Sequence, residues 1–96
     1  SDDDRPVAFV FKTLADPQQG RISFIKVLTG TLEPGLELVN ARTRKGDRLA
    51  HLYVMCGRDM TEVGHAYAGD IIVAPKLAAE TGDTLSITGK VEAAVV

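Results

Sequence analysis

Short apolar runs alternate with polar, turn-forming segments along the chain. The apolar runs are rich in β-branched and aromatic residues, which favour strands over helices. The segments between them contain the glycine, proline and aspartate residues that favour turns. We therefore predict an all-β chain with six strands, at residues 7–14, 21–29, 36–41, 48–55, 71–77 and 84–88.

The strand expected at residues 21–29 changes phase in its middle. Ile22 and Phe24 would lie on one face of this strand, whereas Ile25 and Val27 continue on the other face. A β-bulge near Phe24 would reconcile the two halves, because a bulge adds one unpaired residue and bends the strand. Bent strands spaced roughly 8 to 12 residues apart are typical of barrels, so we predict a small closed antiparallel β-barrel with about six or more strands.

Two segments depart from the strand pattern. Pro75 has no N–H to donate, so the strand at 71–77 should be an edge strand or be bulged at that position. Residues 58–67 contain Gly64 and no clear period, and we expect this segment to be irregular.

The pair Gly-Asp precedes three apolar runs, in "KGDRLAHL" (45–52), "AGDIIVA" (68–74) and "TGDTLSI" (81–87). Such aspartates could be metal ligands or acid–base groups, or they could accept hydrogen bonds from turn N–H groups beside a left-handed glycine. We favour turns, because no further ligands cluster with these aspartates in the sequence. The residues expected to form structural turns are Gly30, Pro34, Gly35, Gly69, Asp70, Gly82 and Asp83.

Composition limits the classes of protein that the chain can belong to. At 96 residues, it is long enough for one domain with a single core. The single cysteine, Cys56, excludes a disulfide-rich secreted scaffold, and apolar residues never run long enough to cross a membrane. We expect a cytoplasmic protein without a membrane partner.

Cys56 with His51 or His65 invites comparison with a Cys-His nucleophile. We instead expect Cys56 to be a small buried hydrophobic residue and His51 to be a partly exposed strand residue. The chain also lacks both Gly-rich phosphate-binding motifs, so we expect no catalytic residue, no metal, no bound cofactor and no GTP binding.

The net charge of −2 argues against a basic surface covering the whole domain, and against DNA as a partner. Cations nevertheless gather in the hairpin expected between the third and fourth strands, with one more beyond the fourth. This group is either a solvated hairpin tip or a phosphate-contacting patch, and charge alone does not separate the two. The candidate RNA-contacting residues are Arg42, Arg44, Lys45, Arg48 and Arg58.

Several motifs together resemble the second domain of elongation factor G. They are "FKT" (11–13), "DP" (16–17), "GRISF" (20–24), "VLTGTLEPG" (27–35), Asn40, the basic hairpin at 42–48, "AGDI" (68–71) and "TGDTL" (81–85). The segments "MCGRDM" and "SITGKVEAAVV" depart from the family's pattern, which suggests a divergent branch. They leave open whether the parent protein acts in translocation, recycling or ribosome protection.

The resemblance implies a translation-factor β-barrel that packs on a GTP-binding domain and contacts small-subunit ribosomal RNA. In that family the Gly-Asp motifs are not catalytic, and GTP and Mg²⁺ belong to the separate domain. Residues 1–6 would be a linker or chain end, 7–88 the barrel, and 89–96 the start of a linker to a following domain. A freestanding small-ligand-binding barrel with a deep apolar pocket is the alternative.

Overall fold

The computed structural model describes residues 5–89, and strands joined by turns make up this part of the chain. None of these residues forms a helix of the length and apolarity needed to span a membrane. The predicted linkers lie mostly outside the described residues. The strands are β1 (Val7–Asp16), β2 (Gly20–Thr29), β3 (Thr31–Leu32), β4 (Leu36–Asn40), β5 (Gly46–Leu49), β6 (Leu52–Cys56), β7 (Asp59–Val63), β8 (Ala66–Tyr67), β9 (Ile71–Pro75) and β10 (Thr84–Ser86).

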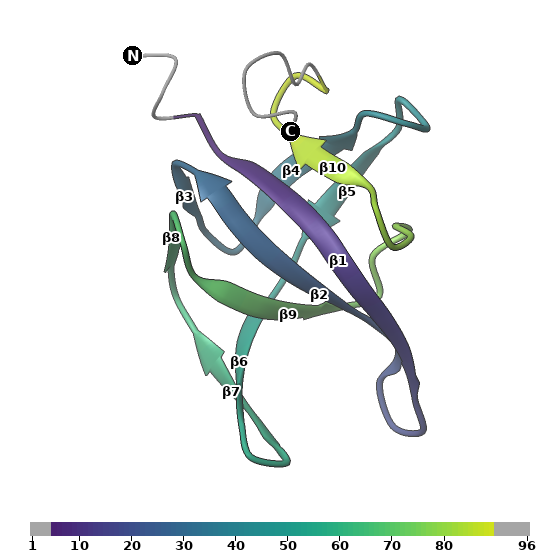
Figure 1. Cartoon of the computed structure of the whole chain (residues 1–96), viewed down its shortest axis with the longest axis vertical. Coiled ribbons are helices and arrows are strands. Elements are labelled where there is room, and N and C mark those ends of the chain that lie inside the picture. Colours follow the sequence, from purple (N-terminus) through teal and green to yellow (C-terminus); the bar gives the residue numbers. More distant parts are fainter. Residues whose placement is uncertain (1–4, 90–96) are drawn as a thin grey trace.

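Eight of these strands form one antiparallel sheet in the order β5-β4-β10-β1-β2-β9-β6-β7, and β3 pairs with β8 in a separate ribbon. The long strands β1 and β2 run side by side through the middle, and the sheet curls around them into a half-barrel (Figure 1). The edge strand β5 continues after two residues into β6, near the opposite edge of the sheet. The structure therefore has the all-β, antiparallel, barrel-type fold that the sequence predicts.

The strand predicted at residues 48–55 is divided between β5 and β6, with a break at Ala50 and His51. Leu49 and Leu52 are both fully buried. A continuous strand would turn residues three positions apart to opposite faces, so the break is what allows both leucines to enter one core.

The prediction that residues 58–67 are irregular is wrong, because β7 and β8 both lie within this segment. Strand β7 pairs with β6 in a hairpin whose turn contains Gly57, with a φ of 65°. Val63 packs against the core from this strand. Pairing with β6 and this apolar contact order a segment whose own composition favours no regular structure.

A bulge does lie beside Phe24, but the extra residue is on the neighbouring strand. Val10 is opposite Ile25 and Lys12 is opposite Phe24, which leaves Phe11 of β1 unpaired. Val10 is buried, whereas Phe11 is exposed and its ring lies 6.3 Å from that of Phe24. The prediction that the strand with Pro75 is an edge strand or is bulged there is wrong, because β9 lies between β2 and β6 and pairs with β2 in unbroken register. The missing N–H is tolerated because Pro75 is the last residue of β9.

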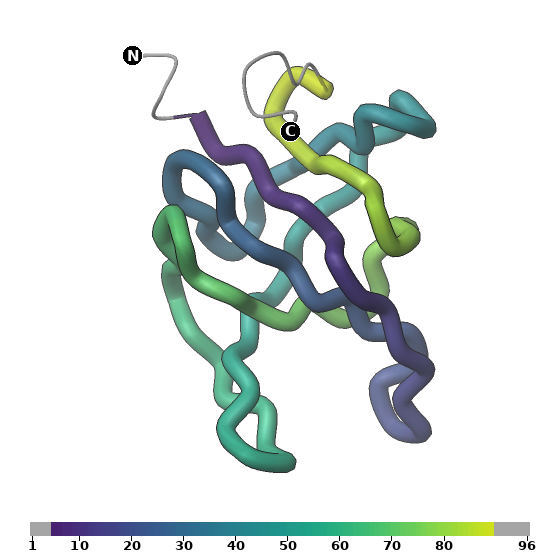
Figure 2. Tube along the Cα trace, in the orientation of Figure 1, coloured from purple at the N-terminus to yellow at the C-terminus, as the bar shows by residue number. Residues whose placement is uncertain are grey.

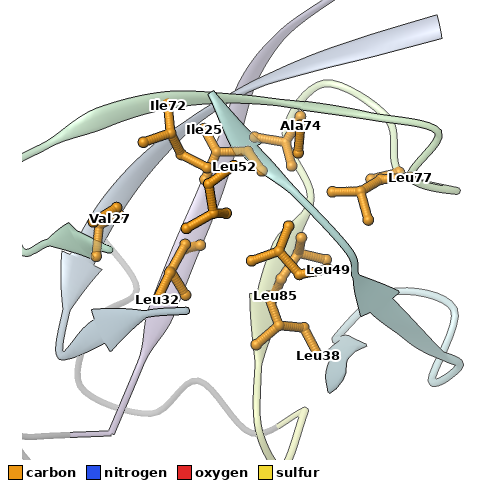
Figure 3. Packing of buried hydrophobic residues seen from close by; sticks show 14 residues of the cluster. Ile25, Val27, Leu32, Leu38, Leu49, Leu52, Ile72, Ala74, Leu77 and Leu85 are labelled. Atoms are coloured by element: carbon orange, nitrogen blue, oxygen red, sulfur yellow. The ribbon is translucent and has the colours of Figure 1, made fainter. Parts of the chain in front are cut away.

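The concave side of the sheet holds one hydrophobic core (Figure 3). Ile25 and Val27 enter it from β2, Ile72 from β9, and the leucines of the hairpins and of β10 close it from the other sides. Burying each leucine or isoleucine contributes roughly 1.5 to 3 kcal/mol. Cys56 is not part of this core: it is exposed at the end of β6, contrary to the prediction.

Candidate functional site: a basic hairpin beside a cleft

The basic segment lies in the turn that joins β4 to β5, and Asn40 shapes this turn. The side-chain oxygen of Asn40 accepts the N–H groups of Arg42 at 2.8 Å and Thr43 at 3.3 Å. Its backbone N–H donates to the carbonyl of Lys45 at 2.9 Å. Arg44 completes the turn in the left-handed region, with a φ of 66°. The turn is therefore held by its own backbone and by one asparagine side chain.

Asp83, immediately before β10, connects this turn to a segment that is distant in sequence. Its carboxylate accepts Arg42 Nε at 2.7 Å and Nη2 at 3.1 Å, and it also accepts Asn40 Nδ2 at 2.8 Å. The backbone N–H of Glu80 donates to the same carboxylate at 2.8 Å. Asp83 is only 4% exposed, and the hydrogen bonds from Arg42 hold the pKa of its carboxyl well below its usual range. Arg42 in turn has a raised pKa because of Asp83.

Two of the three Gly-Asp pairs form the same turn. Asp70 accepts the N–H of Tyr67 at 2.8 Å, as Asp83 accepts that of Glu80, and Gly69 and Gly82 have φ values of 96° and 97°. Each glycine N–H donates at 2.7 Å to the carbonyl of a valine in the adjacent long strand, and that valine donates back to the aspartate carbonyl. The repeated motif therefore fastens two turns to β1 and β2.

The third pair, Gly46-Asp47, does not form this turn. The prediction that all three Gly-Asp pairs mark turns is therefore wrong for this pair. Gly46 begins β5 and is not in the left-handed region. The Asp47 carboxylate accepts the N–H of Ala78 at 2.8 Å, and so links β5 to a loop 31 residues away in sequence.

The structure separates the five candidate RNA-contacting residues. Arg42 is bound to Asp83, and Arg44 donates to the carbonyl of Gly89 at 3.3 Å. Lys45 and Arg48 are exposed on the β4–β5 hairpin. Arg58 lies in the β6–β7 turn, at the other end of the molecule (Figure 1). Arg42 and Arg44 both lie in the turn between β4 and β5, so strand alternation does not set the direction of their side chains.

A cleft of about 350 Å³ lies between this hairpin and residues 77–80. Its floor is formed by the side chains of Leu38, Leu77 and Leu85, which are 1% to 5% exposed. Arg21, from the start of β2, joins Lys45 in lining it. Sequence reasoning missed Arg21, since nothing near it in the chain marks it as a neighbour of the hairpin.

A half-barrel sheet with two Gly-Asp turns fastened to its central strands defines a translation-factor β-barrel domain. The family model for elongation factor G domain 2 matches residues 5–88, and the chain belongs to that family. The crystal structure of ttk003000868 from Thermus thermophilus is similar, with a TM-score of 0.80 and 37% sequence identity. The match covers 94% of this chain and 14% of that one, so the chain spans a small part of its relative's length.

Proposed function

We propose that this chain is the non-catalytic barrel module of an elongation factor G-like translational GTPase in the cytoplasm. The module packs on the GTP-binding domain of its parent protein and contacts small-subunit ribosomal RNA during protein synthesis. Membership of the elongation factor G domain 2 family supports this role. So does the match to one segment of a much longer protein.

The observation that carries the RNA contact is the rigid support of the basic hairpin. The Asn40 and Asp83 hydrogen bonds hold the turn, so that Lys45 and Arg48 are presented to solvent from a preorganised element. Preorganised cations lose less conformational entropy when they bind phosphate. Arg42 uses its Nε and Nη2 atoms on Asp83, and we assign it to positioning the hairpin.

The alternative, a freestanding ligand-binding barrel, requires a deep apolar pocket. The interior of the curled sheet is instead filled by leucine, isoleucine and valine side chains (Figure 3). The cleft lies beside the hairpin and carries charged side chains, which suits a polymer-binding surface better than an enclosed apolar ligand.

The test is the affinity of the parent factor for small ribosomal subunits across a salt series. We expect the double variant Lys45→Glu, Arg48→Glu to bind at least about tenfold more weakly at low salt. The slope of log K against log salt should become shallower by roughly 1.4 to 1.8, since each lost phosphate contact contributes about 0.7 to 0.9.

The matched control is Lys12→Glu with Lys26→Glu, which changes the net charge equally from β1 and β2. Arg58→Glu, measured separately, tests the distant β6–β7 turn. If the hairpin variant and the control variant bind alike, the hairpin is a solvated turn and the RNA contact proposed for it is wrong.

A further inference from the structure

The eight-stranded sheet has two edges, and residues 5–89 cover only one of them. At the β5 edge, the Asp47 carboxylate accepts the N–H of Ala78, so the loop that contains Ala78 lies beside this strand. Strand β7, at the other edge, pairs with β6 alone. Within the described part of the chain, the backbone of β7 takes part in none of the hydrogen bonds formed by turns and loops. The outer side of β7 is therefore an open sheet edge.

The hairpin turn determines which backbone groups of β7 point outward. A two-residue turn closes the hairpin at the pair Cys56 and Asp59, which is a hydrogen-bonded pair in hairpins of this length. Hydrogen-bonded and non-hydrogen-bonded positions then alternate along the two strands. Asp59 and Thr61 therefore bond to β6, whereas the N–H and C=O groups of Met60 and Glu62 point away from it.

Strand β7 lacks several features that protect a sheet edge from other strands. It contains no lysine and no proline, and its register with β6 is unbroken over all five residues. Met60 lies opposite Met55, which is 40% exposed, and methionine adapts its shape to different neighbours. These two methionines bound the segment "MCGRDM" (55–60), which departs from the family's pattern. The divergent segment thus forms an adaptable surface beside the open edge.

The charges on β7 define the kind of segment that can pair with it. Both charged residues of the strand, Asp59 and Glu62, are exposed carboxylates. Glu62 lies 2.7 Å from His51 Nδ1, and the Asp59 side chain has no hydrogen-bond or ion-pair partner among residues 5–89. Opposite charges on neighbouring strands attract each other. The edge therefore suits an extended segment that carries cations.

From this arrangement we propose that the open edge of β7 binds an extended, lysine- or arginine-rich segment of a ribosomal protein, which adds to the sheet as a further strand. Main-chain hydrogen bonds at Met60 and Glu62 provide affinity, and the two carboxylates select for cations. RNA does not fit this edge, because its phosphates would face the same carboxylates. The inference rests on the proposed ribosome binding and adds a protein contact to it, at the end of the molecule distant from the basic hairpin (Figure 1).

The first experiment titrates the 96-residue chain with a short peptide of alternating lysine and valine. We expect the amide proton NMR signals of Met60 and Glu62 to shift, because their N–H groups gain a partner. Those of Asp59 and Thr61 should shift less, because their N–H groups already bond to β6. The matched peptide has the same lysines with proline in place of valine, and it should shift none of the four. Equal effects of the two peptides, or equal shifts of the four amides, overturn the proposal.

The second experiment removes one outward N–H by Met60→Pro, at a position where the pairing with β6 does not use it. We expect the parent factor with this change to bind ribosomes about fivefold more weakly than Met60→Ala, which shortens the side chain and keeps the N–H. Ribosomal RNA stripped of its proteins should bind the two variants equally. Equal ribosome binding by the two variants overturns the proposal, and so does the same fivefold loss on RNA alone.

Melting temperatures show whether Met60→Pro leaves the fold intact. This variant should melt closer to the wild type than Thr61→Pro, which removes an N–H that bonds to β6. If Met60→Pro does not fold, Glu62→Lys provides a second variant and should weaken peptide binding roughly threefold. Glu37→Lys makes the same charge change on β4 and should leave peptide binding as it is. Equal peptide affinity for these two lysine variants overturns the proposal.

The failure of this inference can be told apart from the failure of the proposed function. If Lys45→Glu with Arg48→Glu weakens ribosome binding while Met60→Pro and Met60→Ala bind alike, the proposed function stands and the β7 edge has no part in it. If Met60→Pro loses binding and the hairpin variant does not, the β7 edge binds the ribosome and the RNA contact proposed for the hairpin is wrong.

Discussion

At the scale of single residues, Asp70 and Asp83 have the same backbone role in different surroundings. Both accept the N–H three residues earlier, and both follow a left-handed glycine. Asp70 is exposed, whereas Asp83 is buried and also receives Arg42 and Asn40. Removing an acceptor from buried donors costs more than removing it from donors that water can reach.

We therefore expect Asp83→Ala to lower the free energy of unfolding by about 1 to 3 kcal/mol and Asp70→Ala by about 0.5 to 1 kcal/mol. The Asn variant should be milder than the Ala variant at each position, because its side-chain oxygen can still accept the turn N–H. Urea denaturation of the four variants measures these differences. Equal losses for the two Ala variants would show that the Arg42 and Asn40 contacts add no stability.

At the scale of elements, the exit from β9 shows how one strained residue directs a segment. Pro75 ends the strand, and Lys76 follows in the left-handed region with a φ of 64°. The Lys76 N–H donates to the carbonyl of Arg21 at 3.0 Å, which holds the bend against β2. The chain then places Leu77 in the core and Ala78 opposite Asp47.

Because a left-handed conformation costs a residue with a Cβ roughly 1 to 2 kcal/mol, Lys76→Gly should be more stable than Lys76→Ala by about 1 kcal/mol. Lys26 lies in the middle of β2 and provides the control. There the order should reverse, since glycine weakens a strand interior. Chemical denaturation of the four variants gives the comparison. If alanine is the more stable substitution at both positions, Lys76 is not strained.

At the scale of the whole molecule, one hydrogen-bond network joins parts of the sheet that are distant in sequence. Through Asp83, the end of β4 and the basic turn are connected to the loop that precedes β10. The backbone of Asp83 also bonds to Val10 in β1, which runs through the centre of the fold (Figure 2). Ionised Asp83 thus contributes to the stability of the whole fold.

The pH dependence of stability follows from the lowered pKa of Asp83. Its carboxyl takes up a proton in the unfolded chain near the ordinary pKa of about 4, at a higher pH than in the folded protein. The stabilisation is therefore complete above that pH and is lost as the pH falls below it. We expect the free energy of unfolding to decline below about pH 4 in the wild type and to decline less steeply in Asp83→Asn. Denaturant titrations between about pH 6 and pH 2 measure both slopes, and parallel curves would contradict the assignment.

The candidate site shows which local features the sequence could predict. Turn chemistry at Pro34, Gly35, Gly69 and Gly82 depends on the conformations open to each residue alone, and the structure places the three glycines at positive φ. The cluster of cations could also be found from the chain. Which of these cations is paired with an acid could not be predicted, because Asp83, which binds Arg42 in the folded protein, lies 41 residues away in the sequence.

By itself, the sequence determined the strand-rich composition, the turns and the family, since these depend on local residue preferences and on motifs in a set order. Only the tertiary structure decided where some strands begin and end. Burial of both Leu49 and Leu52 requires a break between β5 and β6, and pairing with β6 orders β7. It also brought Arg21 beside the basic hairpin and paired Arg42 with Asp83. The physical reason is that burial and hydrogen bonding act between residues that are close in space, and the curvature of the sheet determines which distant residues become close.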